Sequence, residues 1–142
     1  MKTCIVVADA ARARFFTRNG DKLEERESLA HAEGRMHEGD LVTDKGADVH
    51  ESTAPSARSS HSEERARKHE AEVFAKQVAK RIHHERVGRQ MEQLIVVAPP
   101  DFLGLLRDKL DKPTSRLLAH TVDKDLSKAR LEEIAAAVAG RK

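Results

Sequence analysis

The alternation of apolar and polar residues over the first thirty positions predicts three consecutive β-strands. Residues 3–9 are apolar or small on both faces, which is typical of a central strand that is covered on both sides. Residues 12–18 follow after a two-residue gap, so we expect these two strands to pair as a hairpin. Asn19 and Gly20 predict a second hairpin turn, which leads into a third strand at 23–29. Charged residues on both faces of that third strand are typical of a sheet edge.

The rest of the chain predicts helices that alternate with two more strands. Residues 62–89 carry apolar residues at helical spacing and indicate one long helix, with Ser62 as its N-cap. Residues 94–100 predict another central strand, followed directly by a second helix. Residues 116–122 predict the last strand. Ser127 is a favourable N-cap for the final helix.

The order β-β-β-α-β-α-β-α predicts a single α/β domain that spans residues 1–142. An antiparallel meander comes first, and right-handed crossovers then add strands parallel to the first strand. The expected sheet is mixed and five-stranded, in the order 3-2-1-4-5, with helices on both faces, as in ribonuclease-H-like folds. Gly104 lies inside the second helix, where it costs about 1 kcal/mol relative to Ala, and it therefore predicts a close contact between that helix and the sheet.

The segment 31–61 has three glycines, one proline and little periodicity, so it predicts a long mobile loop. A loop of this length is a candidate docking segment for a protein partner. It also contains a group of residues of the types that bind zinc, namely His31, Glu33, His37, Glu38 and Asp40. Their spacing matches no recognised zinc pattern, so we expect no metal there.

Composition narrows the classes of function. The chain has no Trp, no Tyr and four Phe, which argues against a platform on which single-stranded bases stack. Its formal net charge is only +2, so any contact with nucleic acid must come from a local patch. The single cysteine, Cys4, lies in an apolar strand and suits a reducing cytosol. The sequence has no export signal, no membrane-length apolar run and no nucleotide-binding glycine motif, so we expect a cytoplasmic protein without a cofactor.

Three aspartates follow the parallel strands of the predicted sheet. Asp9, Asp101 and Asp123 would lie on the edge where open α/β sheets bind ligands, with neighbouring strands about 4.8 Å apart. Clustered carboxylates can hold Mg²⁺ for phosphodiester cleavage, with Asp9 and Asp123 as ligands. Each aspartate also has a structural explanation, as the acceptor of a turn or at the start of a helix. We therefore favour a non-catalytic protein and keep a metal-dependent hydrolase as an alternative.

A set of basic residues shares one face of the long helix. These residues are Arg65, His69, Lys76, Lys80 and His83, and their spacings of 4, 7, 4 and 3 place them opposite the apolar stripe. A basic helical face can follow the phosphates of a nucleic acid. The alternative is a solvated face that is stabilised by pairs such as Glu72 and Lys76.

Several segments carry a family resemblance. "VVADAARARFF", "DLVTDKGADVHES", "FAKQVAKRI", "LIVVAPPDFLGLLRDKL" and "DKDLSK" together resemble the bacterial host attachment protein family. That family is similar to the central ribonuclease-H-like domain of eukaryotic and archaeal release factors, and the resemblance implies an accessory protein associated with RNA or the ribosome. The chain has no Gly-Gly pair, so the Gly-Gly-Gln loop that hydrolyses peptidyl-tRNA is not implied. The alternative is a protein-interaction module that affects attachment indirectly.

Overall fold

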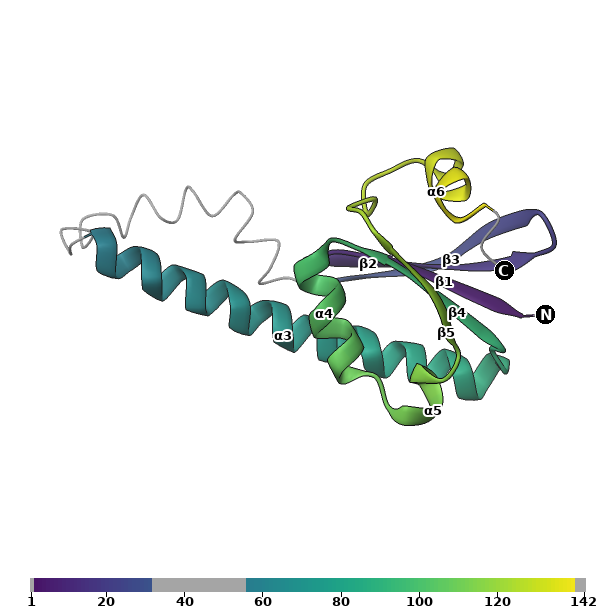
Figure 1. Cartoon of the computed structure of the whole chain (residues 1–142), viewed down its shortest axis with the longest axis horizontal. Coiled ribbons are helices and arrows are strands. Elements are labelled where there is room, and N and C mark those ends of the chain that lie inside the picture. The colour runs from purple at the N-terminus through teal and green to yellow at the C-terminus, as the bar shows by residue number, and fades with distance from the viewer. Residues whose placement is uncertain (1, 32–55, 140–142) are drawn as a thin grey trace.

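The computed structural model describes residues 2–31 and 56–139, with side chains from Ser62 onward in the second range. Five strands form one sheet, and helices cover both of its faces (Figure 1). The strands are β1 (Thr3–Ala8), β2 (Arg12–Asn19), β3 (Lys22–Ala30), β4 (Gln93–Ala98) and β5 (Leu118–Asp123). The helices are α3 (Ser56–Arg89), α4 (Pro100–Lys109), α5 (Lys112–Ser115) and α6 (Leu131–Val138).

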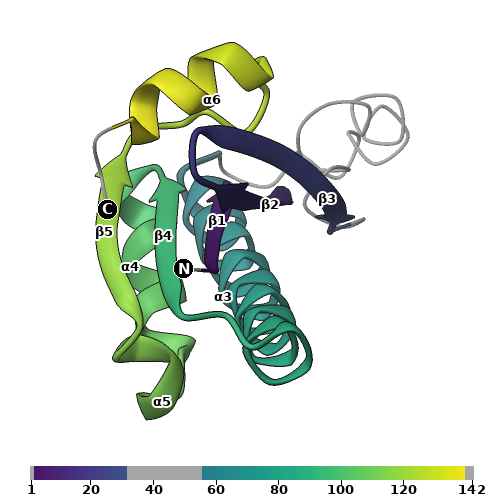
Figure 2. The ribbon, with the colours of Figure 1, turned by 90° about the vertical axis from the view of Figure 1, so that its right-hand side faces the viewer.

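The strand order is β3-β2-β1-β4-β5, which confirms the predicted topology (Figure 2). β1 pairs with β4 in parallel, and β4 pairs with β5 in parallel, whereas β1, β2 and β3 form an antiparallel meander. The parallel strands therefore end at one common edge of the sheet. At that edge, Asp9 directly follows β1, Pro99 directly follows β4, and Asp123 is the last residue of β5.

Two apolar cores lie on opposite faces of the sheet. Val6 of β1 faces α3 and α4, where it packs in one cluster with Phe74 and Phe102. Ile5 faces the other way and packs in a second cluster with Ile134 of α6. All six residues of β1 are buried, because the strand has a helical layer on each side. Burial of each large apolar side chain stabilises the fold by about 1.5–3 kcal/mol.

Helix α3 begins earlier than the sequence pattern predicts. It starts at Ser56 and runs for 34 residues, so Ser62 lies inside the helix and is not its N-cap. The first half of α3 extends past the edge of the sheet (Figure 1), and residues 62–69 are all exposed. Residues 62–69 reach neither core of the described fold, so they carry no apolar periodicity that would mark them as helical. Residues 32–55 of the predicted mobile loop lie outside the described residues.

The end of the chain also differs from the sequence prediction. Helix α6 begins at Leu131, with Arg130 as the N-cap. The side chain of Glu133 accepts the backbone N–H of Arg130 at 3.2 Å, which fixes the start of the helix. Ser127 is buried and caps no helix, because its hydroxyl bonds elsewhere.

Candidate functional site

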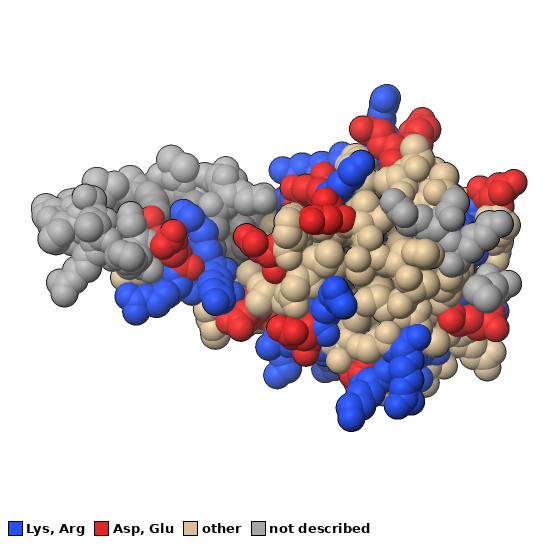
Figure 3. Space-filling view, viewed as in Figure 1, with Lys and Arg blue, Asp and Glu red and all other residues tan. Residues whose placement is uncertain are grey.

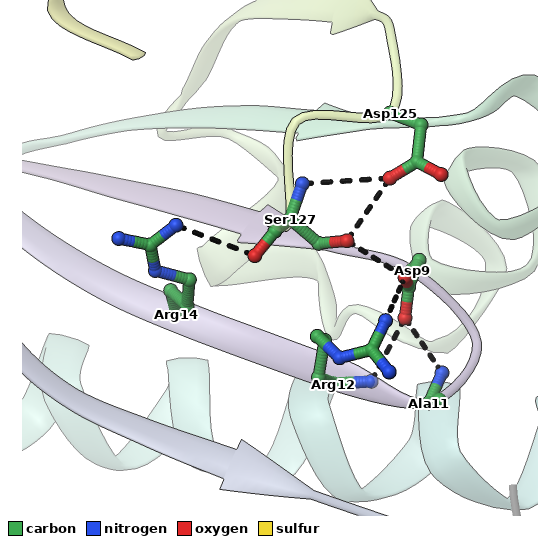
Figure 4. A network of polar contacts seen from close by, with 6 residues as sticks. All are labelled: Asp9, Ala11, Arg12, Arg14, Asp125 and Ser127. Atoms are coloured by element: carbon green, nitrogen blue, oxygen red, sulfur yellow. Dashed lines mark hydrogen bonds and ion pairs between the residues drawn. The ribbon is translucent and has the colours of Figure 1, made fainter. Parts of the chain in front are cut away.

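Asp9 follows β1, and both oxygens of its carboxylate are occupied by donors from the chain itself (Figure 4). Oδ1 accepts the backbone N–H groups of Ala11 at 2.8 Å and Arg12 at 2.9 Å. Oδ2 accepts the guanidinium of Arg12 and the hydroxyl of Ser127, each at 2.7 Å. A carboxylate offers about four lone-pair sites, and four donors fill them. Asp9 therefore holds the β1–β2 turn together and has no vacant site for a metal ion.

The same network joins β2 and β3 to the segment before α6. Arg14 donates to the backbone carbonyls of Ser127 at 3.3 Å and Ala129 at 2.6 Å. The other donors of that guanidinium bind both carboxylate oxygens of Glu25, at 3.0 and 2.9 Å. The hydrogen bond from Arg14 holds the pKa of Glu25 below its ordinary value. Arg14 thus ties strands β2 and β3 to the connection between β5 and α6.

The other two aspartates lie on the same edge with exposed side chains. Asp101 stands in the first turn of α4, and Asp123 closes β5 opposite Ala98 of β4. Within the described residues, no three His, Cys, Asp or Glu side chains are arranged to hold a metal ion. The topology places the three aspartates at one edge of the sheet, and the hydrolase alternative stays a prediction.

A groove of about 890 Å³ opens beside this edge, between the first half of α3 and α4. Its apolar wall includes Ala71, Pro99 and Phe102, and its polar wall includes Arg67 and Lys68 from α3. The volume falls within the range of about 300–1,000 Å³ that is usual for ligand pockets.

Gly104 lines this groove, which contradicts the prediction that it contacts the sheet. It is exposed, and a Cβ built on it would meet nothing within 4 Å. Its neighbours Leu103 and Leu106 are buried and face the core instead. The glycine in α4 therefore has no packing reason inside the described part of the chain.

The structure places all five predicted basic residues on α3 with exposed side chains. Among the described residues, Lys76 and Lys80 have no hydrogen-bond or ion-pair partner. His83 differs, because its Nδ1 lies 2.8 Å from Oδ2 of Asp111. Hydrogen bonds from Thr114, with a smaller contribution from His83, hold the pKa of Asp111 below its ordinary value. Within the part of the chain that the structure describes, His83 is thus the one member of the set with an ion-pair partner.

The charge balance of α3 is strongly positive over its last 25 positions. Residues 65–89 contain eight Lys and Arg against three Glu, while the whole chain has a formal net charge of +2. Two of those glutamates are engaged within the fold. Glu70 lies 2.8 Å from Nε2 of His31, and Glu85 is buried beside Arg89. In Figure 3, Lys and Arg side chains lie along the part of α3 that extends past the sheet, with some Glu among them.

His31 belongs to the group of potential zinc ligands in the segment 31–61, but in the structure it packs against α3. Only 4% of its surface is exposed, and its ring stacks on Phe74 at 5.3 Å in addition to the contact with Glu70. The other members of that set, Glu33, His37, Glu38 and Asp40, lie outside the described residues. His31 therefore fixes the end of β3 to α3.

The family described as "Protein required for attachment to host cells" matches residues 4–138. The chain belongs to this family. The resemblance drawn from the sequence segments is thereby confirmed, and no curated protein matches the sequence. Among solved structures, this family member is similar to the crystal structure of the archaeal translation termination factor aRF1, with a TM-score of 0.56 and 15% identity.

The match to aRF1 covers 94% of this host-attachment family member and 36% of the termination factor. The chain therefore spans about a third of that protein, and at this identity the likeness concerns the fold alone. In the described part of this family member, no helix is long and apolar enough to cross a membrane.

Proposed function

We propose that this host-attachment family member is a non-catalytic cytosolic accessory protein that binds RNA or the ribosome through the outer face of α3. The observation that carries the proposal is the row of exposed cations at Arg65, Lys76 and Lys80, none of which has a polar partner among the described residues. From Arg65 to His83 this face extends about 27 Å along the helix axis, at about 1.5 Å per residue. A rigid row of that length can contact several phosphates at once.

The expected mode of binding is electrostatic and independent of sequence. Lysine and arginine on a helix surface contact phosphates and release condensed counterions, which supplies most of the affinity of non-specific binding. Apart from histidines, Phe74 is the one aromatic residue in the described part of α3, and it is fully buried. This part of the helix therefore exposes no Phe, Tyr or Trp ring on which bases could stack. Strong dependence on salt and weak preference for sequence follow from this composition.

The likeness of the fold to a translation termination factor makes the ribosome the first partner to test. The rival proposal is a regulatory module that binds a protein through residues 31–61 and affects attachment indirectly. Most of that segment lies outside the described residues, so the rival proposal rests on the sequence of residues 31–61. A metal-dependent hydrolase has less support, because four donors from the chain saturate Asp9.

Cosedimentation of the protein with purified ribosomes at low and high salt tests the proposal. We expect the protein in the ribosomal pellet at low salt and in the supernatant at high salt, because salt weakens phosphate contacts. A protein that stays in the supernatant at low salt contradicts the proposal and favours the protein-interaction module.

A further inference from the structure

A second cavity, of about 330 Å³, lies at the opposite end of the sheet from the groove, beside the start of β1 and the end of α3. We call it the β1 cavity. Four cationic residues line it, namely Lys2, Arg18, Arg26 and Arg89, together with Glu85. The concentration of cations around one small hollow is unexpected in a chain whose formal net charge is only +2.

Arg26 lies at a β-bulge in the edge strand. Phe15 pairs with Glu27 and Phe16 pairs with Glu25, so Arg26 is the extra residue of β3. Side chains alternate along a regular strand, and a bulge of one residue reverses that alternation.

The reversal is visible in how β3 packs on either side of the bulge. Leu23 packs against the core under α6, whereas Leu29, six positions later, packs against the core under α3. In a regular strand both would face the same side. Beyond the bulge, Glu27 pairs with Arg81 of α3, on the same face as the β1 cavity. Arg26 already shares the α3 side with Glu24, two positions before it, and the bulge brings Glu27 to that side as well.

Arg89 is already oriented before any ligand arrives. Its Nε lies 3.1 Å from Oε1 of Glu85, a carboxylate whose residue is only 6% exposed. Glu85 has a second cation 3.6 Å away, from Arg81, so its charge is compensated. The contact uses Nε, which leaves both terminal nitrogens of Arg89 without a partner among the described residues. A guanidinium that is fixed in advance loses less conformational entropy when it binds an oxyanion.

The remaining charged groups around the cavity are mostly engaged at its rim. Lys2 Nζ lies 3.5 Å from the carbonyl oxygen of Arg89. Arg18 donates to the carbonyl of Val138 in α6, so its charged group points away from the cavity and lies on the other face of the sheet. Glu24, which lies 3.3 Å from Arg26, has a half-exposed side chain. Glu92 accepts the backbone N–H of Lys2 and does not line the cavity.

Cys4 forms part of the wall and adds no negative charge. Burial, with a smaller contribution from Glu85, raises the pKa of its thiol to about 12, so it is neutral at physiological pH. The cavity therefore presents three cationic side chains, from Lys2, Arg26 and Arg89, against the carboxylate of Glu85, which is already paired.

We propose that the β1 cavity binds a small molecule that carries at least two oxyanion charges, as a diphosphate group does. Two or more guanidinium groups around one hollow suit such a ligand, because each can donate two parallel hydrogen bonds to an oxyanion. The volume lies near the lower limit of about 300 Å³ for ligand pockets, so the ligand is small. This site is separate from the outer face of α3 and does not depend on the proposed binding of RNA.

Inorganic pyrophosphate, compared with sodium chloride at matched ionic strength, tests the proposal in a thermal-shift titration. We expect pyrophosphate to raise Tm by several degrees, because a ligand that binds only the folded state stabilises it. Arg26→Gln should weaken the apparent affinity by about tenfold, through loss of a charge-assisted contact. Arg116→Gln is the matched control, since Arg116 is exposed and does not line the cavity. If Arg26→Gln does not fold, Lys2→Gln provides the same comparison.

The same assay with a short RNA in place of pyrophosphate shows whether the β1 cavity and the outer face of α3 bind different ligands. The cavity proposal predicts that Arg26→Gln weakens the binding of pyrophosphate and leaves any binding of RNA as in wild type. The proposed function predicts that replacing both Lys76 and Lys80 by Gln weakens the binding of RNA, and the cavity proposal predicts that this variant still binds pyrophosphate. Equal shifts in wild type, Arg26→Gln and Arg116→Gln would overturn it, and so would no shift in wild type. Loss of both ligands in Arg26→Gln would also overturn it, since the cavity would then be part of the RNA-binding surface.

Discussion

The hydroxyl of Ser127 donates a 2.7 Å hydrogen bond to Oδ2 of Asp9, across 118 positions of the chain. This contact joins the end of β1 to the segment before α6. It completes the set of four donors around the carboxylate, so the aspartate that looks like a catalytic candidate in the sequence is a structural residue. Ser127 itself is 2% exposed, which shields the contact from water.

Replacement of Asp9 should therefore reduce stability. Asp9→Asn keeps an acceptor for the turn but cannot accept from Ser127 and Arg12 together, and we expect it to lower the free energy of unfolding by about 1–3 kcal/mol. Ser127→Ala should lower it by about 0.5–1.5 kcal/mol. Urea denaturation of both single variants and the double variant should show coupling, because the two side chains touch. An Asp9→Asn variant of unchanged stability that loses a Mg²⁺- or Mn²⁺-dependent nuclease activity would contradict this role.

Gly104→Ala should stabilise the protein. The position is in a helix interior and no atom of the described residues lies within 4 Å of the added methyl group, so the gain is about 1 kcal/mol, or roughly 4 °C in Tm. Gly20→Ala is the matched control. Gly20 also has open space around it, but its φ of +61° is unfavourable for an L side chain, so that variant should lose stability. Destabilisation by Gly104→Ala would mean that the α4 backbone packs more closely than described.

Glu25 should contribute stability that depends on pH. Its pKa is held below the ordinary value by the hydrogen bond from Arg14, so the pair stabilises the fold above about pH 4.3, the ordinary pKa of Glu. That contribution is lost as pH falls through the lower folded pKa. Urea midpoints of wild type and Glu25→Gln should therefore differ more at pH 7 than at a pH well below about 4.3. A gap that is the same at both pH values would disprove the linkage.

Cys4 should resist alkylation in the folded protein. The thiol is 5% exposed and burial raises its pKa to about 12, so little thiolate is available to iodoacetamide at pH 8. Modification should be slow in buffer and fast in denaturant, as mass spectrometry would show. The raised pKa also predicts that stability falls as pH rises above about 8.5, where the unfolded thiol ionises. Rapid modification under native conditions would show that β1 is not buried as described.

The sequence predicts the strand order because the informative patterns are local. Residues 3–9 and 94–100 are apolar on both faces, and the order of elements then leaves few topologies. The start of α3 is missed because residues 62–69 are exposed and lack a periodic apolar stripe. Ser127 resembles an N-cap, and nothing near it in sequence reveals that its partner is Asp9. His31 and Glu70 are likewise 39 positions apart. The bulge at Arg26 is hidden because charged residues occupy both faces of β3.

The central claim is that α3 binds phosphates with its outer face, and the salt dependence of RNA affinity tests it most directly. For single-stranded RNA, the slope of log K against log salt is about −0.7 per contact, so replacing Lys76 and Lys80 by Gln should flatten it by roughly 1.4. The control variant replaces the exposed Lys124 and Lys128 by Gln, which removes the same number of positive charges near α6, on the side of the sheet opposite α3. Its slope should equal that of wild type. Filter binding at several salt concentrations measures all three proteins. Identical weak binding by all three would contradict the claim.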